Sequence, residues 1–117
     1  MNISIMKKRI IPISLPSMGQ EEWEAIKEPI FSGWVTQGPK VAEFEKLFAA
    51  RHQVKHAIAV SNCTTALHLA LVATGVNEGD EVIIPAFTWV ATANAVLYCR
   101  ATPVFADIDI STFNINP

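Results

Sequence analysis

The stretch His56-Ala57-Ile58-Ala59-Val60-Ser61-Asn62-Cys63-Thr64-Thr65-Ala66-Leu67-His68-Leu69-Ala70-Leu71 decides the fold of this chain. Residues 57–60 form a short apolar run, which predicts a parallel strand covered on both faces. Ser61 and Asn62 are residues that cap helices, and from Thr64 the apolar side chains recur at helical spacing. The stretch therefore predicts a buried strand, a tight polar turn and a helix.

The turn at residues 61–65 has the features of an anion site. It presents free backbone N–H groups at the positive end of a helix dipole, flanked by short hydroxyl side chains. A phosphate or a carboxylate is the ligand that such a turn favours. On local pattern alone, an ordinary capped helix is the more frequent case, because every βα unit contains one.

Working outward from this stretch, the chain alternates between strands and helices. We expect an extended arm over residues 1–16, a helix capped by Ser17 and stopped by Gly33, and a second helix over residues 40–52. Beyond the stretch, strands are expected at residues 81–85 and 103–106, with a helix between them at 88–99. The alternation predicts an α/β fold with a mainly parallel sheet, right-handed crossovers and flanking helices.

Composition excludes several classes of protein. The chain has 117 residues, a net charge of −2 and two cysteines without metal-ligand spacing. Because no basic stripe is present, a nucleic-acid partner is not expected. No apolar run approaches the ~20 residues that span a bilayer, and the N-terminus lacks a signal-peptide core, so a cytoplasmic protein is expected. The chain stops without a closing helix or strand, which indicates the front part of something longer.

Ligands of open parallel sheets bind beyond the carboxyl ends of the strands. Residues 61–65 offer donors for an anion, Trp89 offers a flat ring, and Asp107 and Asp109 offer carboxylates. Together they describe a site for a planar, phosphorylated molecule. Each feature also has a structural explanation, since Trp89 is more often a core or interface residue and an acid after a strand more often caps a turn. No metal site, GxGxxG fingerprint or P-loop is present.

The combination of motifs closely resembles the N-terminal part of the DegT/DnrJ/StrS family of pyridoxal-phosphate (PLP) sugar aminotransferases. The resemblance runs from about Ile10 to Pro117. The motifs that carry it, in order, are Gly33-Trp34-Val35-Thr36-Gln37-Gly38-Pro39, Phe44-Glu45, Ser61 to Leu71, Gly79-Asp80-Glu81-Val82-Ile83-Ile84-Pro85, Phe87-Thr88-Trp89-Val90-Ala91-Thr92 and Ala101-Thr102-Pro103-Val104-Phe105.

The resemblance implies a fold and a set of site residues. Residues 17–117 would be the N-terminal part of the large, PLP-binding domain of the fold type I (aspartate-aminotransferase-like) fold. Asn62, Cys63 and Thr64 would hold the cofactor phosphate by backbone N–H groups and the Thr64 hydroxyl, and Trp89 would stack on the pyridine ring. Thr36 and Gly38 would border the sugar-nucleotide pocket, near a dimer interface.

The family reaction transfers an amino group, usually from glutamate, to a nucleotide-linked keto-sugar for surface polysaccharides or secondary metabolites. A lysine forms the Schiff base with PLP. It is expected beyond residue 117, so the chain itself carries no catalytic residue, and a homodimer is expected. Two alternatives stay open: a PLP-dependent sugar dehydratase, in which histidine replaces that lysine, and a non-catalytic remnant or binding module.

One position departs from the family pattern. Arg100 stands where glycine usually precedes Ala-Thr-Pro-Val. An arginine adopts a positive φ only at a cost, so the turn at this position is expected to differ.

Overall fold

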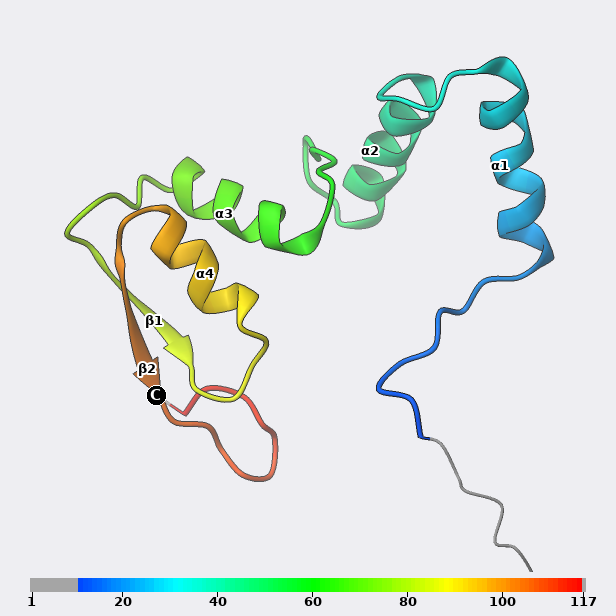
Figure 1. Ribbon diagram of the computed structural model, residues 1–117. Helices are drawn as coiled ribbons and strands as arrows, with labels where there is room; N and C mark the ends of the chain where they lie inside the picture. The colour runs from blue at the N-terminus through cyan, green and yellow to red at the C-terminus, as the bar shows by residue number, and fades with distance from the viewer. Residues whose placement is uncertain (1–10, 117) are drawn as a thin grey trace, which may run out of the picture. The chain divides into compact units, whose positions relative to one another are not determined.

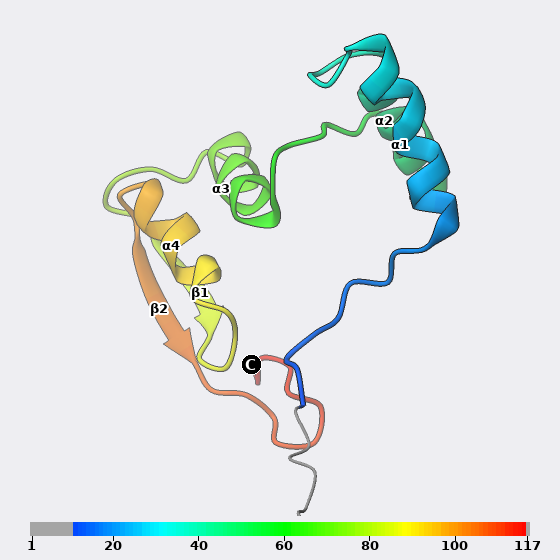
Figure 2. The same ribbon diagram turned by 45° about the vertical axis from the view of Figure 1, so that its right-hand side comes forward.

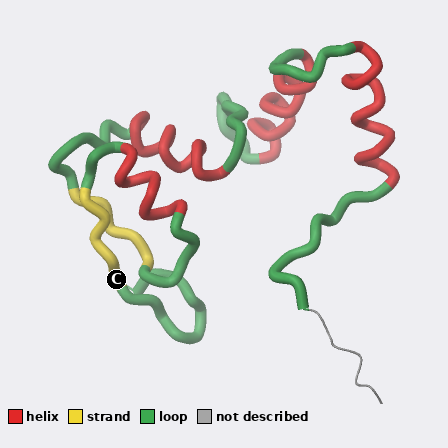
Figure 3. Tube along the Cα trace, in the orientation of Figure 1, coloured by secondary structure: helices red, strands yellow, loops and turns green. Residues whose placement is uncertain are grey.

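The computed structural model describes residues 11–116, which fall into two compact units that divide between Glu43 and Phe44. The elements are α1 (Gln20–Ser32), α2 (Pro39–Arg51), α3 (Cys63–Ala73), β1 (Glu81–Pro85), α4 (Ala91–Tyr98) and β2 (Thr102–Ala106) (Figure 1). The expected arm lies partly outside the described residues. Its described part, residues 11–16, contains neither helix nor strand, as Figure 3 shows.

In the first unit, α1 begins two residues later than the sequence predicted. The N-cap is Gly19 rather than Ser17, because the Glu22 carboxylate accepts the Gly19 backbone N–H at 2.6 Å and closes the first turn there. This hydrogen bond also lowers the pKa of Glu22. The helix ends as expected at Gly33, whose φ of 73° is the left-handed conformation that glycine adopts without steric cost.

The second unit is a β–α–β arrangement with α3 packed beside α4. β1 and β2 pair in parallel, with Glu81 opposite Thr102 and Pro85 opposite Ala106. Figures 1 and 2 show the two arrows side by side with α4 over one face of them. The buried core of this unit consists of Ile84, Ala95, Val96 and Ala101. From α3 onward, helices and strands alternate as predicted, and the bounds of β1 and β2 lie within one residue of the expected ones.

The prediction of a strand at residues 57–60 is wrong. This segment has no strand hydrogen bonds, and Ile58 is 73% exposed rather than buried. A strand exists only through its ladder with a neighbour, and within residues 11–116 the sheet consists of β1 and β2 alone. The Ala59 N–H donates instead to the Glu45 carboxylate at 2.8 Å.

The helix predicted from Thr88 begins at Ala91, because residues 86–90 form the bend that leaves β1. It then ends in a Schellman motif. The Arg100 N–H donates to the Leu97 carbonyl at 2.9 Å, and the Ala101 N–H donates to the Val96 carbonyl at 3.3 Å. Arg100 takes a φ of 59°, which corrects the expectation that an arginine would avoid this conformation. The motif requires a left-handed residue there, and the contact of Ala101 with Val96 in the core holds it in place.

Replacing Arg100 with glycine is therefore expected to stabilise the protein by about 0.5–1 kcal/mol. Glycine removes the strain energy that a residue with a Cβ has in the left-handed conformation. This gain is larger than the free-energy cost of glycine's greater entropy in the unfolded chain. The lost ion pair with Glu78 is exposed and spans 3.5 Å, so it contributes little. Urea unfolding of Arg100→Gly against Arg100→Ala checks this, because alanine loses the same ion pair but keeps the strain. Equal midpoints for the two variants would contradict the argument.

Candidate functional site

The site is built on the N-terminus of α3. Asn62 caps the helix with an extended backbone, and its side-chain oxygen accepts the Thr65 backbone N–H at 2.9 Å. The same oxygen accepts the Thr65 hydroxyl at 3.1 Å. This is the capped turn that the sequence predicted, with Asn62 rather than Ser61 as the cap. The side-chain oxygen of Asn62 is thus engaged within the protein.

The backbone donors predicted for the phosphate have no acceptor among the described residues. The N–H groups of Asn62, Cys63 and Thr64 make no hydrogen bond there, and the Thr64 hydroxyl also has no partner. The first turn of α3 contains no acidic residue that would repel an anion. The helix dipole adds positive potential at the same point. The turn can therefore bind a phosphate or carboxylate through Cys63 and Thr64.

A hollow of about 370 Å³ lies beside this turn. It is lined by Asn62, Thr64, Thr65, His68 and Tyr98. The His68 and Tyr98 rings meet edge to face, with their centroids 5.5 Å apart. His68 is half-buried. Neither His68 nor Tyr98 is among the site residues predicted from sequence, because both lie inside helices, where spacing marks packing positions and not binding positions.

The structure does not bring Trp89 into this hollow. Trp89 lies in the bend between β1 and α4, its side chain is 76% exposed, and it is not a lining residue. Its ring is therefore free to cover a flat ligand, and its stacking role stays a prediction. Cys63 is the first residue of α3 and has an exposed thiol.

The acids after β2 cap turns, which is the more common of the two roles considered from sequence. The Asp109 carboxylate accepts the backbone N–H groups of Ser111 at 3.0 Å and Thr112 at 2.9 Å, together with both of their hydroxyls. These hydrogen bonds lower the pKa of Asp109 to about 2. Asp107 accepts the Ile108 N–H at 2.8 Å. Asp109 therefore serves the turn rather than a ligand.

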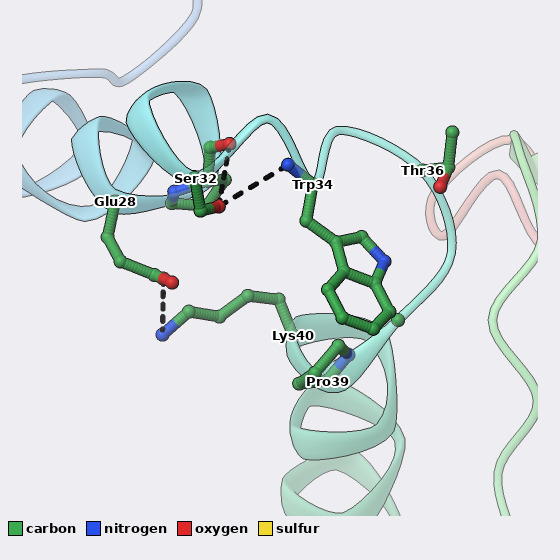
Figure 4. Close-up of a pocket in the computed structure, with 8 residues that line it drawn as sticks. Glu28, Ser32, Trp34, Thr36, Pro39 and Lys40 are labelled. Atoms are coloured by element: carbon green, nitrogen blue, oxygen red, sulfur yellow. Dashed lines mark hydrogen bonds and ion pairs between the residues drawn. The ribbon is translucent and has the colours of Figure 1, made fainter.

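The other two predicted site residues, Thr36 and Gly38, line a separate cavity of about 110 Å³ in the first unit. Figure 4 shows the Glu28 and Lys40 side chains facing each other near the Trp34 ring. The Lys40 Nζ and Glu28 Oε2 atoms form an ion pair at 3.6 Å. The Trp34 indole N–H donates to the Gln37 carbonyl at 3.1 Å. A Cβ atom on Gly38 would overlap the indole, so the loop needs glycine here.

Two kinds of site are not found in the part of the chain that the structure describes. Within residues 11–116, no three His, Cys, Asp or Glu side chains are arranged to hold a metal ion. In the same range, no helix combines the length and apolar character needed to cross a bilayer.

Comparison with known proteins establishes the family of this chain. The model of the DegT/DnrJ/EryC1/StrS aminotransferase family matches residues 16–117. The chain belongs to this family. The resemblance described from the motifs is thereby confirmed.

Individual relatives agree with this assignment. Spore coat polysaccharide biosynthesis protein SpsC of Bacillus subtilis (strain 168) is 51% identical over 111 residues, covering 95% of this chain and 28% of SpsC. The PLP form of the putative sugar aminotransferase Spr1654 from Streptococcus pneumoniae is 36% identical with a TM-score of 0.82, covering 91% of this chain and 27% of that one. An aminotransferase from Psychrobacter cryohalolentis is 40% identical, also with a TM-score of 0.82, over 91% and 28%.

These matches confirm the fold class, because the similar structures are sugar aminotransferases and the chain shares their α/β architecture with a parallel sheet and flanking helices. The chain spans a little over a quarter of the length of the relatives it matches.

Proposed function

We propose that this chain forms the cofactor-phosphate part of a PLP-dependent aminotransferase that acts on a nucleotide-linked keto-sugar. Family membership supports the reaction class, and the PLP form of Spr1654 supports the cofactor. The name of SpsC favours a product used in a surface polysaccharide. Glutamate as the amino donor, a homodimer and a cytoplasmic location complete the proposal. Residues 17–117 would belong to the PLP-binding large domain.

The observation that carries the proposal is the turn at the start of α3. The N–H groups of Asn62, Cys63 and Thr64 and the Thr64 hydroxyl are donors without a partner among the described residues. No acidic side chain opposes them in the first turn, and a polar hollow opens next to Thr64. These features fit the phosphate of PLP.

The residues of this chain bind and orient, and the cofactor supplies the electron sink that stabilises negative charge at the reacting carbon. Asn62, Cys63 and Thr64 would hold the phosphate, and Trp89 would cover one face of the ring. Thr36 and Gly38 would border the pocket for the nucleotide sugar. In the proposal, these residues bind and orient the cofactor and the nucleotide sugar, and none of them transfers a proton.

Replacing Thr64 with valine tests the proposal directly. We expect the dissociation constant of PLP from the intact protein to rise about tenfold, because a hydrogen bond to a charged phosphate is lost. Absorbance titration of the cofactor-free protein measures this constant. Thr74→Val is the matched control, since the Thr74 hydroxyl serves only carbonyl groups at the other end of the same helix.

A second measurement follows the reaction. The intact protein should convert glutamate to 2-oxoglutarate when a nucleotide-linked keto-sugar is supplied, with an amino-sugar product detected by mass spectrometry. An intact protein that binds no PLP would overturn the proposal, as would equal affinities for Thr64→Val and Thr74→Val. Loss of water from the sugar without amino transfer would overturn the aminotransferase assignment in favour of dehydration.

A further inference from the structure

We infer that Thr65 is a positioning residue for the phosphate site, although it does not touch the phosphate. The inference rests on the proposed function and concerns how the turn at α3 holds its shape. Thr65 lies directly after the three residues proposed to bind the phosphate, of which Asn62 is the first. The side chains of Thr65 and Asn62 are joined by a hydrogen bond that spans Cys63 and Thr64.

The contacts around Thr65 form a closed ring of three side chains. The Asn62 amide donates to the Ser61 hydroxyl at 3.3 Å. The Ser61 and Thr65 hydroxyl oxygens lie 3.4 Å apart. The Thr65 hydroxyl donates to the Asn62 oxygen at 3.1 Å, so the Ser61 hydroxyl proton is the one available to Thr65. Each hydroxyl in the ring thus gives and accepts one hydrogen bond, an arrangement in which neighbouring bonds strengthen one another.

The donors and acceptors in this ring are arranged so that Thr65 positions the phosphate site without binding the phosphate. Because the Thr65 hydroxyl proton is used by Asn62, it is not available to a phosphate oxygen. The Thr65 backbone N–H is also taken by Asn62. The donors left for the anion are the N–H groups of Asn62, Cys63 and Thr64 and the Thr64 hydroxyl, and the ring joins Asn62 to Thr65 across this segment. Donors that are fixed before the ligand arrives bind more tightly, because less ordering accompanies binding.

Thr65→Ala is the variant that opens the ring without weakening the helix. Alanine is the best helix former, so the variant should keep or improve the stability of α3. We expect the dissociation constant of PLP to rise three- to tenfold in the intact protein, because the donors of Cys63 and Thr64 lose their fixed orientation. Thr65→Ser keeps the hydroxyl and should restore the affinity to within twofold of the original.

Pyridoxal, which lacks the phosphate, provides the readout that a merely structural role would not produce. Its affinity should be the same for the original protein and for Thr65→Ala. The ³¹P resonance of bound PLP should shift in Thr65→Ala and return in Thr65→Ser. Absorbance titration of the cofactor-free protein gives both affinities, and a thermal melt confirms that each variant is folded.

The outcomes distinguish this inference from the proposed function. If the original protein binds PLP but Thr65→Ala binds it equally well, the inference is wrong and the proposed function stands. Equal weakening of PLP and pyridoxal, or failure of Thr65→Ser to restore the affinity, also contradicts it. If no variant binds PLP, the proposed function and the inference are both wrong.

Discussion

Ile84→Ala is expected to lower the free energy of unfolding by about 2–4 kcal/mol. Ile84 lies on β1, is only 4% exposed and packs in the core cluster with Val96 and Ala101. Truncation removes buried methyl and methylene groups and leaves a cavity between the sheet and α4, because the surrounding side chains relax only partly into the space. Urea unfolding of the intact protein, followed by circular dichroism, measures the loss.

The neighbouring Ile83 provides a matched control. It is the same residue type on the same strand, but alternation places it on the other face of the sheet, where it is 68% exposed. Ile83→Ala should therefore cost less than about 1 kcal/mol, mostly through strand propensity. Equal losses for the two variants would show that both faces of β1 are buried and would contradict the asymmetry seen in the structure.

The pattern of Ile84 and its neighbours explains why most of this unit could be predicted from sequence. Short apolar runs bounded by turn residues marked β1 and β2, and the helical spacing after Thr64 marked α3. Residues 57–60 are also a short apolar run but form no strand. A strand requires hydrogen bonds to a neighbouring strand, and the run alone does not provide that neighbour. Local sequence carries no information about that partner.

The same limit applies to the site. Asn62 was recognisable as a cap because few residue types place an acceptor over a helix N-terminus. The ring that joins Asn62 to Ser61 and Thr65 depends on side-chain rotamers, which spacing does not determine. The positive φ of Arg100 depends on the Val96 carbonyl and on the burial of Ala101. The residue type at position 100 therefore led to the wrong prediction for this turn.

Gly38→Ala is expected to have the second largest effect, a loss of about 1–3 kcal/mol. The new methyl group would occupy the position of the Trp34 indole, and the ring or the loop must move. Backbone strain does not contribute, since the φ of Gly38 lies outside the left-handed range. Gly19→Ala is the control, because the nearest atom to its added Cβ would be the Glu22 carboxylate oxygen at 3.7 Å.

A double-mutant cycle with Trp34→Ala identifies the clash as the cause. Trp34→Ala alone removes the indole and its hydrogen bond to the Gln37 carbonyl. In that background Gly38→Ala has nothing to displace, so its cost should fall to about 0.5 kcal/mol or less, which gives a coupling of about 1–2 kcal/mol. Additive losses would place the cost in the backbone and would contradict the packing argument.

Because Thr36 lies in the same loop, the proposed function adds a kinetic expectation: Gly38→Ala should raise KM for the nucleotide sugar more than it lowers kcat.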